Sequence, residues 1–178
     1  MIAVLNLRGG LMKILILMLM VIVSLSTTAQ QCTEYNNLSV VQKGRLEFAY
    51  HQGAEYDLGW TLTAIAYNES MAGRWRLNMT TGDVGLFQVN RKTAHKVLGI
   101  TSHYKKLKLD QKLVYDDILN AYVALDVLRY FKKYHKGNWK KMVMSYNNGF
   151  SINTKKAEDY LASISSSVRM LKQCMKIY

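Results

Sequence analysis

The segment from Asn120 to Tyr134 constrains the fold most, because apolar residues occupy nearly every side of the helix that its spacing predicts. Its apolar core positions are Ala121, Ala124, Leu125, Leu128 and Phe131. A helix that is apolar all round must be covered by other elements. We therefore predict that residues 120–134 form the central, most enclosed helix of a mainly α-helical protein.

Helical spacing recurs on both sides of this segment. Asp57 precedes one such stretch and is the expected N-cap of its helix. Gly137 and Asn138 separate the central segment from a later helix, whose inward face ends at Tyr146. The predicted helices span residues 38–53, 57–70, 93–98, 111–121 and 139–146.

The helical spacing stops between the second and third of these stretches. Thr80, Thr81, Gly82 and Asp83 are turn-forming residues, and their neighbours suit extended structure. We predict a small extended or β insertion near residues 76–90. No internal repeat or low-complexity linker divides the chain, so a single domain is expected.

The beginning of the chain has the pattern of an export signal. Two basic residues precede a largely apolar run at 14–25, and small residues lead up to Ala29. This run is too short to span a bilayer, and the small residues suit cleavage after Ala29. We expect a signal peptide at 1–29, a domain at 30–178, and a location in the periplasm or outside the cell, with no stable membrane anchor. An uncleaved signal that acts as an anchor is the alternative.

The two cysteines, Cys32 and Cys174, stand near opposite ends of the predicted domain. In an exported protein such a pair most simply forms one disulfide, worth about 4 to 5 kcal/mol for a loop this long in the chain-entropy model. Two free thiols are the alternative in a reducing compartment. The histidines form no ligand cluster with the cysteines or with each other, so no metal site is predicted. No phosphate loop or dinucleotide fingerprint occurs, so no cofactor is expected.

A formal net charge of +12 favours an acidic partner: nucleic acid, anionic lipid or an anionic cell wall. Residues 129–141 interleave basic and aromatic side chains, as nucleic-acid binders do. Their aromatic residues, however, are spaced to serve a helix core, and an export signal removes the chain from nucleic acid. No nucleic-acid partner is therefore expected.

Glu69 lies where a carboxylate is hardest to explain as scaffolding. It follows Leu58, Leu62 and Ile65 on one helical stripe, at steps of four, three and four residues. Burial of a carboxyl group without a charged partner raises its pKa, so that it keeps its proton near neutral pH and can act as a general acid. The alternative is that the helix frays before Glu69 and the side chain reaches water.

Polar residues close three separate segments of the chain. These are Glu69-Ser70, the stretch Asp-Val-Gly-Leu-Phe-Gln-Val-Asn at 83–90, and Ser-Tyr-Asn-Asn-Gly at 145–149. Together they resemble the soluble lytic transglycosylase family, the goose-lysozyme-like branch of the lysozyme superfamily. In that family a Glu-Ser pair, a Gly-Leu-Met-Gln-Ile stretch and an Ala-Tyr-Asn-Ala-Gly box follow in the same order.

The resemblance covers about residues 56–152, with three departures. Phe87, which we place among the substrate-binding residues, stands where the family has Met, and Ser145 and Asn148 replace the two alanines. The resemblance implies a lysozyme-like fold and an enzyme that acts on peptidoglycan glycan strands. It implies cleavage of the β-1,4 bond between N-acetylmuramic acid and N-acetylglucosamine, with 1,6-anhydromuramoyl products.

The resemblance also implies roles for individual residues. Glu69 would protonate the leaving oxygen and then act as the base, while the substrate's own acetamido group stabilises the anomeric centre. Tyr146 would hydrogen-bond Glu69 and hold its rotamer. Ser70 would support the acid from the adjacent position, and Gln88 and Asn147 would contact the sugar.

Asp83 is the ambiguous residue of the second segment. Its surroundings also resemble the stretch of animal-type lysozymes that carries a second catalytic carboxylate, which would make the enzyme a hydrolytic muramidase. Transglycosylases of conjugation and injection machines share an Asp-x-Gly here, so a cell-envelope-spanning machine is a candidate partner. Otherwise Asp83 is a turn residue that follows Gly82 or a substrate contact. A non-catalytic wall-binding protein is a further alternative, against which Glu69, Gln88 and Tyr146 together argue.

Overall fold

The computed structural model describes residues 32–177. They fall into two compact units, of which the first ends at Asn37 and the second, the main body, begins at Leu38. Residues 32–36 form a short helical stretch in the first unit. The predicted signal peptide, residues 1–29, lies outside the described residues. Within the part that the structure describes, no helix is both long and apolar enough to cross a membrane.

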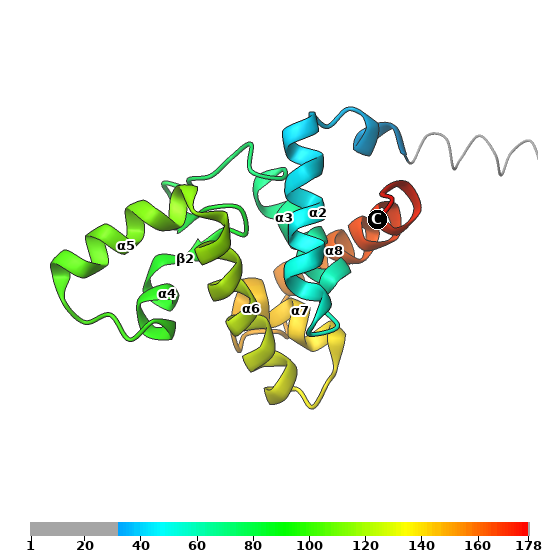
Figure 1. The fold of residues 1–178 in the computed structure, drawn as a ribbon. Helices are drawn as coiled ribbons and strands as arrows, with labels where there is room; N and C mark the ends of the chain where they lie inside the picture. Colours follow the sequence, from blue (N-terminus) through cyan, green and yellow to red (C-terminus); the bar gives the residue numbers. More distant parts are fainter. Residues whose placement is uncertain (1–31, 178) are drawn as a thin grey trace, which may run out of the picture. The chain divides into compact units, whose positions relative to one another are not determined.

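The main body consists of helices and one small antiparallel sheet (Figure 1). Its elements are α2 (Val40–Ala54), α3 (Gly59–Ser70), β1 (Asp83–Val84), β2 (Val89–Asn90), α4 (Arg91–Val97), α5 (His103–Tyr115), α6 (Asp117–Tyr134), α7 (Trp139–Asn148) and α8 (Lys155–Cys174). Side-chain N-caps define several of the helix starts, because each accepts a hydrogen bond from a free N–H of the first turn. Ser39 caps α2, Asn138 caps α7 and Thr154 caps α8.

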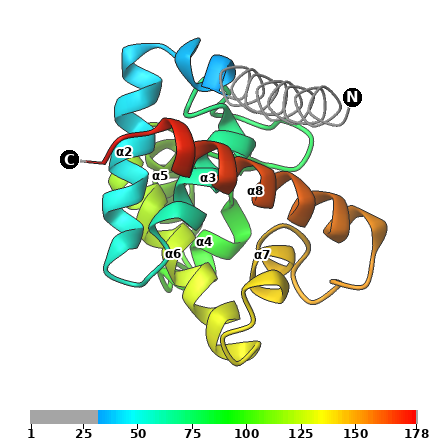
Figure 2. The same cartoon turned by 90° about the vertical axis from the view of Figure 1, so that its right-hand side faces the viewer.

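The helix α3 is the enclosed helix of the main body. Every residue from Thr61 to Ala66 is buried, and both α2 and α8 pack against this helix. In Figure 2, α8 crosses in front of α3. The expected N-cap at Asp57 is wrong, because α3 begins after Leu58 and Asp57 lies in a left-handed turn with φ of 59°.

The prediction that residues 120–134 form the most enclosed helix is wrong. The helix exists as part of α6, but Tyr122, Tyr130 and Tyr134 are more than half exposed. Its buried stripe packs against α5 and α7, whereas the tyrosines, whose hydroxyl groups tolerate water, cover the outer side.

The predicted insertion at residues 76–90 is confirmed. Asp83 pairs with Asn90 and Val84 pairs with Val89 in a two-stranded antiparallel sheet. Gly85 follows β1 with a φ of 85°, and a Cβ there would overlap the side chain of Asn120. Only glycine therefore fits this turn.

The region after the insertion differs in part from the expectation. The helix predicted at 93–98 is α4, but the one predicted at 111–121 is divided at Asp116 between α5 and α6. Asp116 is extended, and its side chain accepts a hydrogen bond from the N–H of Leu119, which starts α6. An aspartate inside a helical pattern can break it, because its side chain offers a cap.

The last helix, α8, was not predicted from the sequence pattern. It packs against α3 and α7, so it closes the main body on the side of the second and fifth predicted helices. Both Cys32 and Cys174 are disulfide-bonded, as predicted for the pair.

Candidate active site

Glu69 occupies the last turn of α3, where the helix meets a cavity of about 660 Å³. Its side chain is half-buried, so the helix does not fray before it. The helix ends one residue later, and Met71 turns the chain away with a φ of 50°. The rigid end of a buried helix therefore presents the carboxyl group to the cavity.

Two side chains hydrogen-bond the Glu69 carboxyl group. The hydroxyl of Tyr160 donates to Oε1 of Glu69 at 2.7 Å, and Asn147 contributes a second side-chain hydrogen bond. Burial raises the pKa of Glu69 to about 7, and the negative charge of Asp83 also raises it. The bonds from Tyr160 and Asn147 and the positive charge of Lys156 lower it. A carboxyl group with this pKa exchanges its proton near neutral pH, as a general acid must.

Tyr146 lies in the same cavity, but its predicted hydrogen bond to Glu69 is not the one that the structure shows. The hydroxyl of Tyr146 donates to the carbonyl oxygen of Phe87 at 2.8 Å, and Tyr160 takes the expected place on Glu69. Burial raises the pKa of Tyr146 well above its usual value, so the phenol remains a donor. Tyr146 thus joins the end of α7 to the loop between β1 and β2.

The insertion supplies the opposite wall of the cavity. Gln88 has a left-handed φ of 47°, and its side-chain amide donates to the carbonyl oxygen of Gly85 at 2.9 Å. Asp83 lines the cavity with one oxygen held by the Nδ2 of Asn90 at 2.9 Å. The structure therefore brings Glu69 of the first motif together with Asp83 and Gln88 of the second in one cavity.

Neither Phe87, predicted to bind substrate, nor Ser70, predicted to support the acid, exposes its side chain to the cavity. The side chains of Ser70 and Phe87 are fully buried and cannot touch a substrate in the cavity. The Ser70 hydroxyl donates to the carbonyl oxygen of Leu86 at 2.6 Å and accepts from the N–H of Gly73 at 2.8 Å. Ser70 therefore fixes the loop to the end of α3, and Phe87 anchors that loop in the core.

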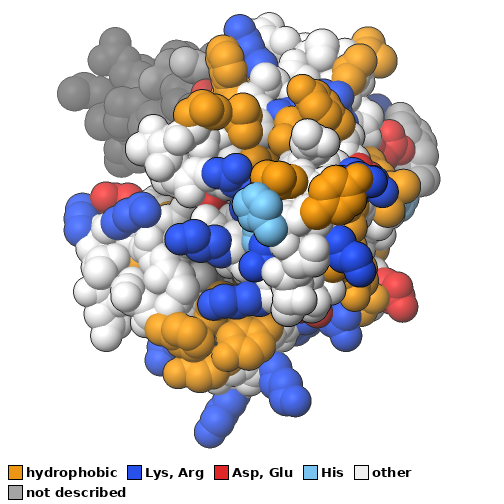
Figure 3. Space-filling view, turned by 90° about the vertical axis from the view of Figure 1, so that its left-hand side faces the viewer, with side chains coloured by type: hydrophobic (Ala, Val, Ile, Leu, Met, Phe, Trp, Pro, Cys, Tyr) orange, Lys and Arg blue, Asp and Glu red, His pale blue; other side chains and the backbone are white. Residues whose placement is uncertain are grey.

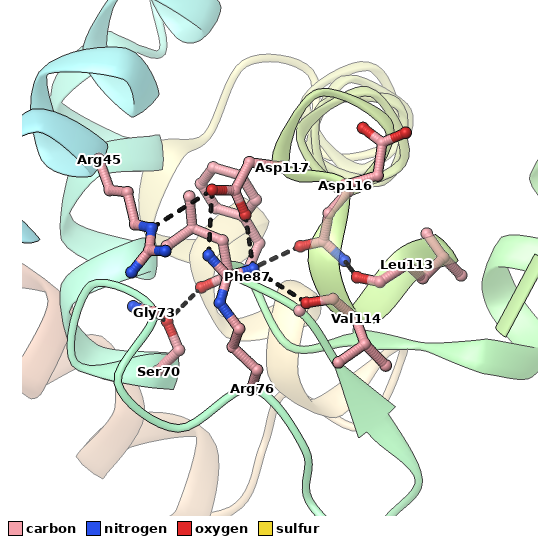
Figure 4. A network of polar contacts seen from close by, with 12 residues as sticks. Arg45, Ser70, Gly73, Arg76, Phe87, Leu113, Val114, Asp116 and Asp117 are labelled. Carbon is pink, nitrogen blue, oxygen red and sulfur yellow. Dashed lines mark hydrogen bonds and ion pairs between the residues drawn. The ribbon is translucent and has the colours of Figure 1, made fainter. Parts of the chain in front are cut away.

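A polar network holds the loop from the other side (Figure 4). Asn120 accepts from the N–H of Phe87 at 2.8 Å and donates to the carbonyl oxygen of Val84 at 2.9 Å. Arg76 makes a two-point contact with Asp117, at 2.7 and 3.0 Å. Such bidentate pairs fix geometry as well as charge. The loop that carries Gln88 is therefore rigidly placed relative to Glu69.

The residues that α8 contributes were missed from the sequence. Tyr160 and Lys156 lie on its first turns, and no short motif surrounds either residue. The available signal was the spacing of seven residues between Ala157, Ile164 and Leu171, all of which are buried. That stripe predicts an amphipathic helix, and Tyr160 lies on its inward side.

Both acidic and basic side chains line the cavity. Acidic side chains lie inside the cavity, where Glu69, Asp83 and Asp126 line it together with Lys96 and Lys156. Figure 3 shows Lys and Arg side chains spread over one face of the molecule, with hydrophobic side chains in separate patches. Among the described residues, no cluster of three or more His, Cys, Asp or Glu could hold a metal ion.

A helical domain that presents one glutamate of raised pKa to a groove, with amide and phenol groups around it, has the architecture of a lysozyme-like enzyme that cleaves glycosidic bonds. The family model of the transglycosylase SLT domain matches residues 47–167, which is more than half of the chain. The chain belongs to this family of peptidoglycan lytic transglycosylases. No curated protein and no solved structure matches the chain.

Proposed function

We propose that the protein is exported and cuts the β-1,4 bond between N-acetylmuramic acid and N-acetylglucosamine without consuming water. Glu69 protonates the oxygen that leaves the anomeric carbon, and the substrate's acetamido group stabilises that carbon. The Glu69 carboxylate then accepts the proton of the C6 hydroxyl, whose oxygen closes a 1,6-anhydro ring. One carboxyl group therefore serves as acid and base in turn.

The observation that carries this proposal is the environment of Glu69. Its pKa of about 7 leaves both the protonated and the ionised forms accessible at neutral pH, as a group that first gives and then takes a proton requires. The hydrogen bond from Tyr160 to Oε1 fixes the carboxyl group in one orientation. Asn147 and Gln88 line the same cavity and offer amide groups to the sugar or its acetamido group.

A second candidate function rests on Asp83. Its carboxylate lies in the same cavity and is near enough to raise the pKa of Glu69 by its charge. A second carboxylate in this position would suit a hydrolytic muramidase, in which it stabilises or attacks the anomeric carbon. The bond from Asn90 occupies one of its oxygens, however, which favours a role for Asp83 in setting the charge of the site.

Mass spectrometry of the muropeptides released from purified sacculi tests the proposal. We expect 1,6-anhydromuramoyl ends, and a mild loss of rate for Asp83→Asn. Asp126→Asn is the matched control, because Asp126 is a half-buried carboxylate of the same cavity that makes no resolved contribution to the pKa of Glu69. Products heavier by one water, with a severe loss for Asp83→Asn alone, would establish the muramidase.

Export is tested separately, by the mass of the protein recovered outside the cytoplasm. The proposal expects a chain that begins at Gln30, after removal of residues 1–29. A full-length chain in the membrane fraction would support an uncleaved anchor, and a full-length chain in the cytoplasm would contradict export.

A further inference from the structure

A cluster of aromatic side chains lines part of the cavity that contains Glu69. Tyr130, Phe131 and Phe150 line that cavity, and Tyr134 packs behind them. Phe131 is buried, but Tyr130 is 54% and Phe150 is 63% exposed. Single exposed aromatic residues need no explanation, whereas contiguous ones at the rim of a groove mark a binding surface.

The chain fixes these rings before any ligand arrives. Tyr130 and Tyr134 are one helical turn apart on α6 and lie nearly parallel, with ring centroids 6.3 Å apart. Phe150 follows Gly149, whose φ of 60° ends α7 and returns the chain toward α6. The Phe150 ring stands nearly edge-on to Tyr130, Phe131 and Tyr134, with centroids 6.5, 5.5 and 5.2 Å away. Edge-to-face packing of this kind holds rings in place, so little conformational entropy remains to be lost on binding.

The chemistry of this surface differs from that of the rest of the groove. Carboxyl, amide and ammonium groups surround Glu69, whereas the aromatic end offers flat apolar rings. A pyranose ring has one face made largely of C–H bonds and an edge of hydroxyl groups. Its C–H face can cover an aromatic ring and displace water from it, while its hydroxyl groups remain hydrated.

We propose that Tyr130 and Phe150 form a stacking subsite for a sugar of the glycan strand other than the two joined by the cleaved bond. The inference rests on the proposed function, since it takes the strand in this groove to be the substrate. Binding energy from such a sugar helps to hold the strand at Glu69, so it adds to the affinity for long strands and not for short ones.

The test measures binding rather than turnover. Glycan oligomers of defined length, from a disaccharide unit to eight sugars, are titrated into the Glu69→Gln protein by calorimetry. We expect affinity to rise with length in this protein. Adding Tyr130→Ala and Phe150→Ala should lower the affinity for the longest oligomer by on the order of tenfold and leave the affinity for the shortest unchanged. Phe150→Trp should retain the rise of affinity with oligomer length.

Tyr115→Ala is the matched control, because Tyr115 is 80% exposed and does not line the cavity. It should leave affinity unchanged at every length. Equal weakening for all lengths would overturn the inference, because the rings would then act through the neighbouring Tyr146-Asn147 segment. An unchanged affinity for the longest oligomer would overturn it as well. Neither result depends on whether the enzyme makes anhydro or reducing ends, so the proposed reaction stands or fails separately.

Discussion

Glu69 is held from two sides of the molecule that differ in how they arise and in what they do. One side consists of the insertion and the end of α7, which bring Asp83 and Asn147 to the cavity within short motifs. The other side is α8, which brings Tyr160 and Lys156, both more than eighty residues after Glu69 in the chain.

Asp83 on the motif side and the two residues on α8 also act on the proton of Glu69 in opposite directions. The charge of Asp83 raises the pKa of Glu69, whereas the hydrogen bond from Tyr160 and the charge of Lys156 lower it. Asn147, which lowers the pKa, is the exception on the motif side. Burial contributes most and raises the pKa, so the two sides set how far the value lies above that of an exposed carboxyl group. The charge of Asp83 thus favours the protonated acid, whereas Tyr160 and Lys156 on α8, together with Asn147, favour the carboxylate that acts as the base.

Glu69→Gln removes the group on which both sides act and should have the largest effect. The rate of muropeptide release is expected to fall by roughly 10²- to 10⁴-fold, the usual contribution of a general acid. Asp126→Asn serves as the control for a substitution in the same cavity. Substantial residual turnover by the pure variant would remove Glu69 from the acid role.

At alkaline pH, Glu69→Gln should be more stable than the unmodified protein. The pKa of Glu69 is about 7 in the folded protein against an ordinary value of 4.5, so the folded state binds more protons between these values. The free energy of unfolding of the unmodified protein therefore falls as pH rises through this window. Glutamine does not titrate, so above pH 7 the variant should be more stable by roughly 1 to 3 kcal/mol, measured by urea unfolding at pH 5 and pH 8. Equal stabilities at pH 8 would contradict the raised pKa.

Tyr160→Phe breaks the α8 side at its direct contact with Glu69. The rate should fall by about tenfold, the cost of one lost hydrogen bond to the acid. The alkaline limb of the pH–rate profile should move to higher pH, because the pKa of Glu69 rises when this bond is lost. Tyr146→Phe is the matched variant from the motif side. It loses the bond to Phe87, so it should cost about 1 kcal/mol of stability without moving that limb upward. The reverse pattern would restore Tyr146 as the partner of the acid.

Asp83→Asn removes the charge that the motif side contributes. The pKa of Glu69 should fall, so the alkaline limb should move to lower pH, opposite to the shift in Tyr160→Phe. The pH dependence of the initial rate, measured on both variants under the same conditions, checks this sign. Shifts in the same direction would show that the two sides do not oppose one another.

Lys156→Gln should have the smallest effect. Its positive charge makes the weakest of the resolved contributions to the pKa of Glu69, and water screens it because the side chain is exposed. A slight upward shift of the alkaline limb is expected, larger at low salt than at high salt. A shift that is independent of salt would mean that Lys156 acts by a direct contact instead of by charge.

The same contrast explains how much could be predicted from the sequence. Glu69 was recognisable because a carboxylate at the end of an apolar stripe conflicts with burial, and the residues Thr80 to Asp83 marked the insertion as a turn. Local chemistry was sufficient for the motif side. Tyr160 was not recognisable, because an ordinary tyrosine becomes a partner of Glu69 only when α8 packs on α3.

Burial was the second property that local pattern did not settle. Ser70 and Phe87 adjoin Glu69 and Gln88 in sequence, yet their side chains are fully buried. Residues 120–134 of α6 were mistaken for the most enclosed helix, because the prediction rested on the apolar positions, which are buried, and left out the tyrosines between them, which lie in water. The fold class, the insertion and the place of Glu69 at a buried helix end could thus be predicted, and the long-range packing around Glu69 could not.

Titration of the Glu69 carboxyl group itself is the most direct test of the account. Carbon NMR of protein labelled at the side-chain carboxyl of glutamate follows each group across pH 3 to 9, and Glu69→Gln identifies the Glu69 signal by its loss. The account predicts a midpoint near 7 for Glu69, a higher one in Tyr160→Phe and a lower one in Asp83→Asn. A midpoint near the ordinary 4.5 in the unmodified protein would contradict it, because Glu69 would then lack its proton at the pH where it must donate one.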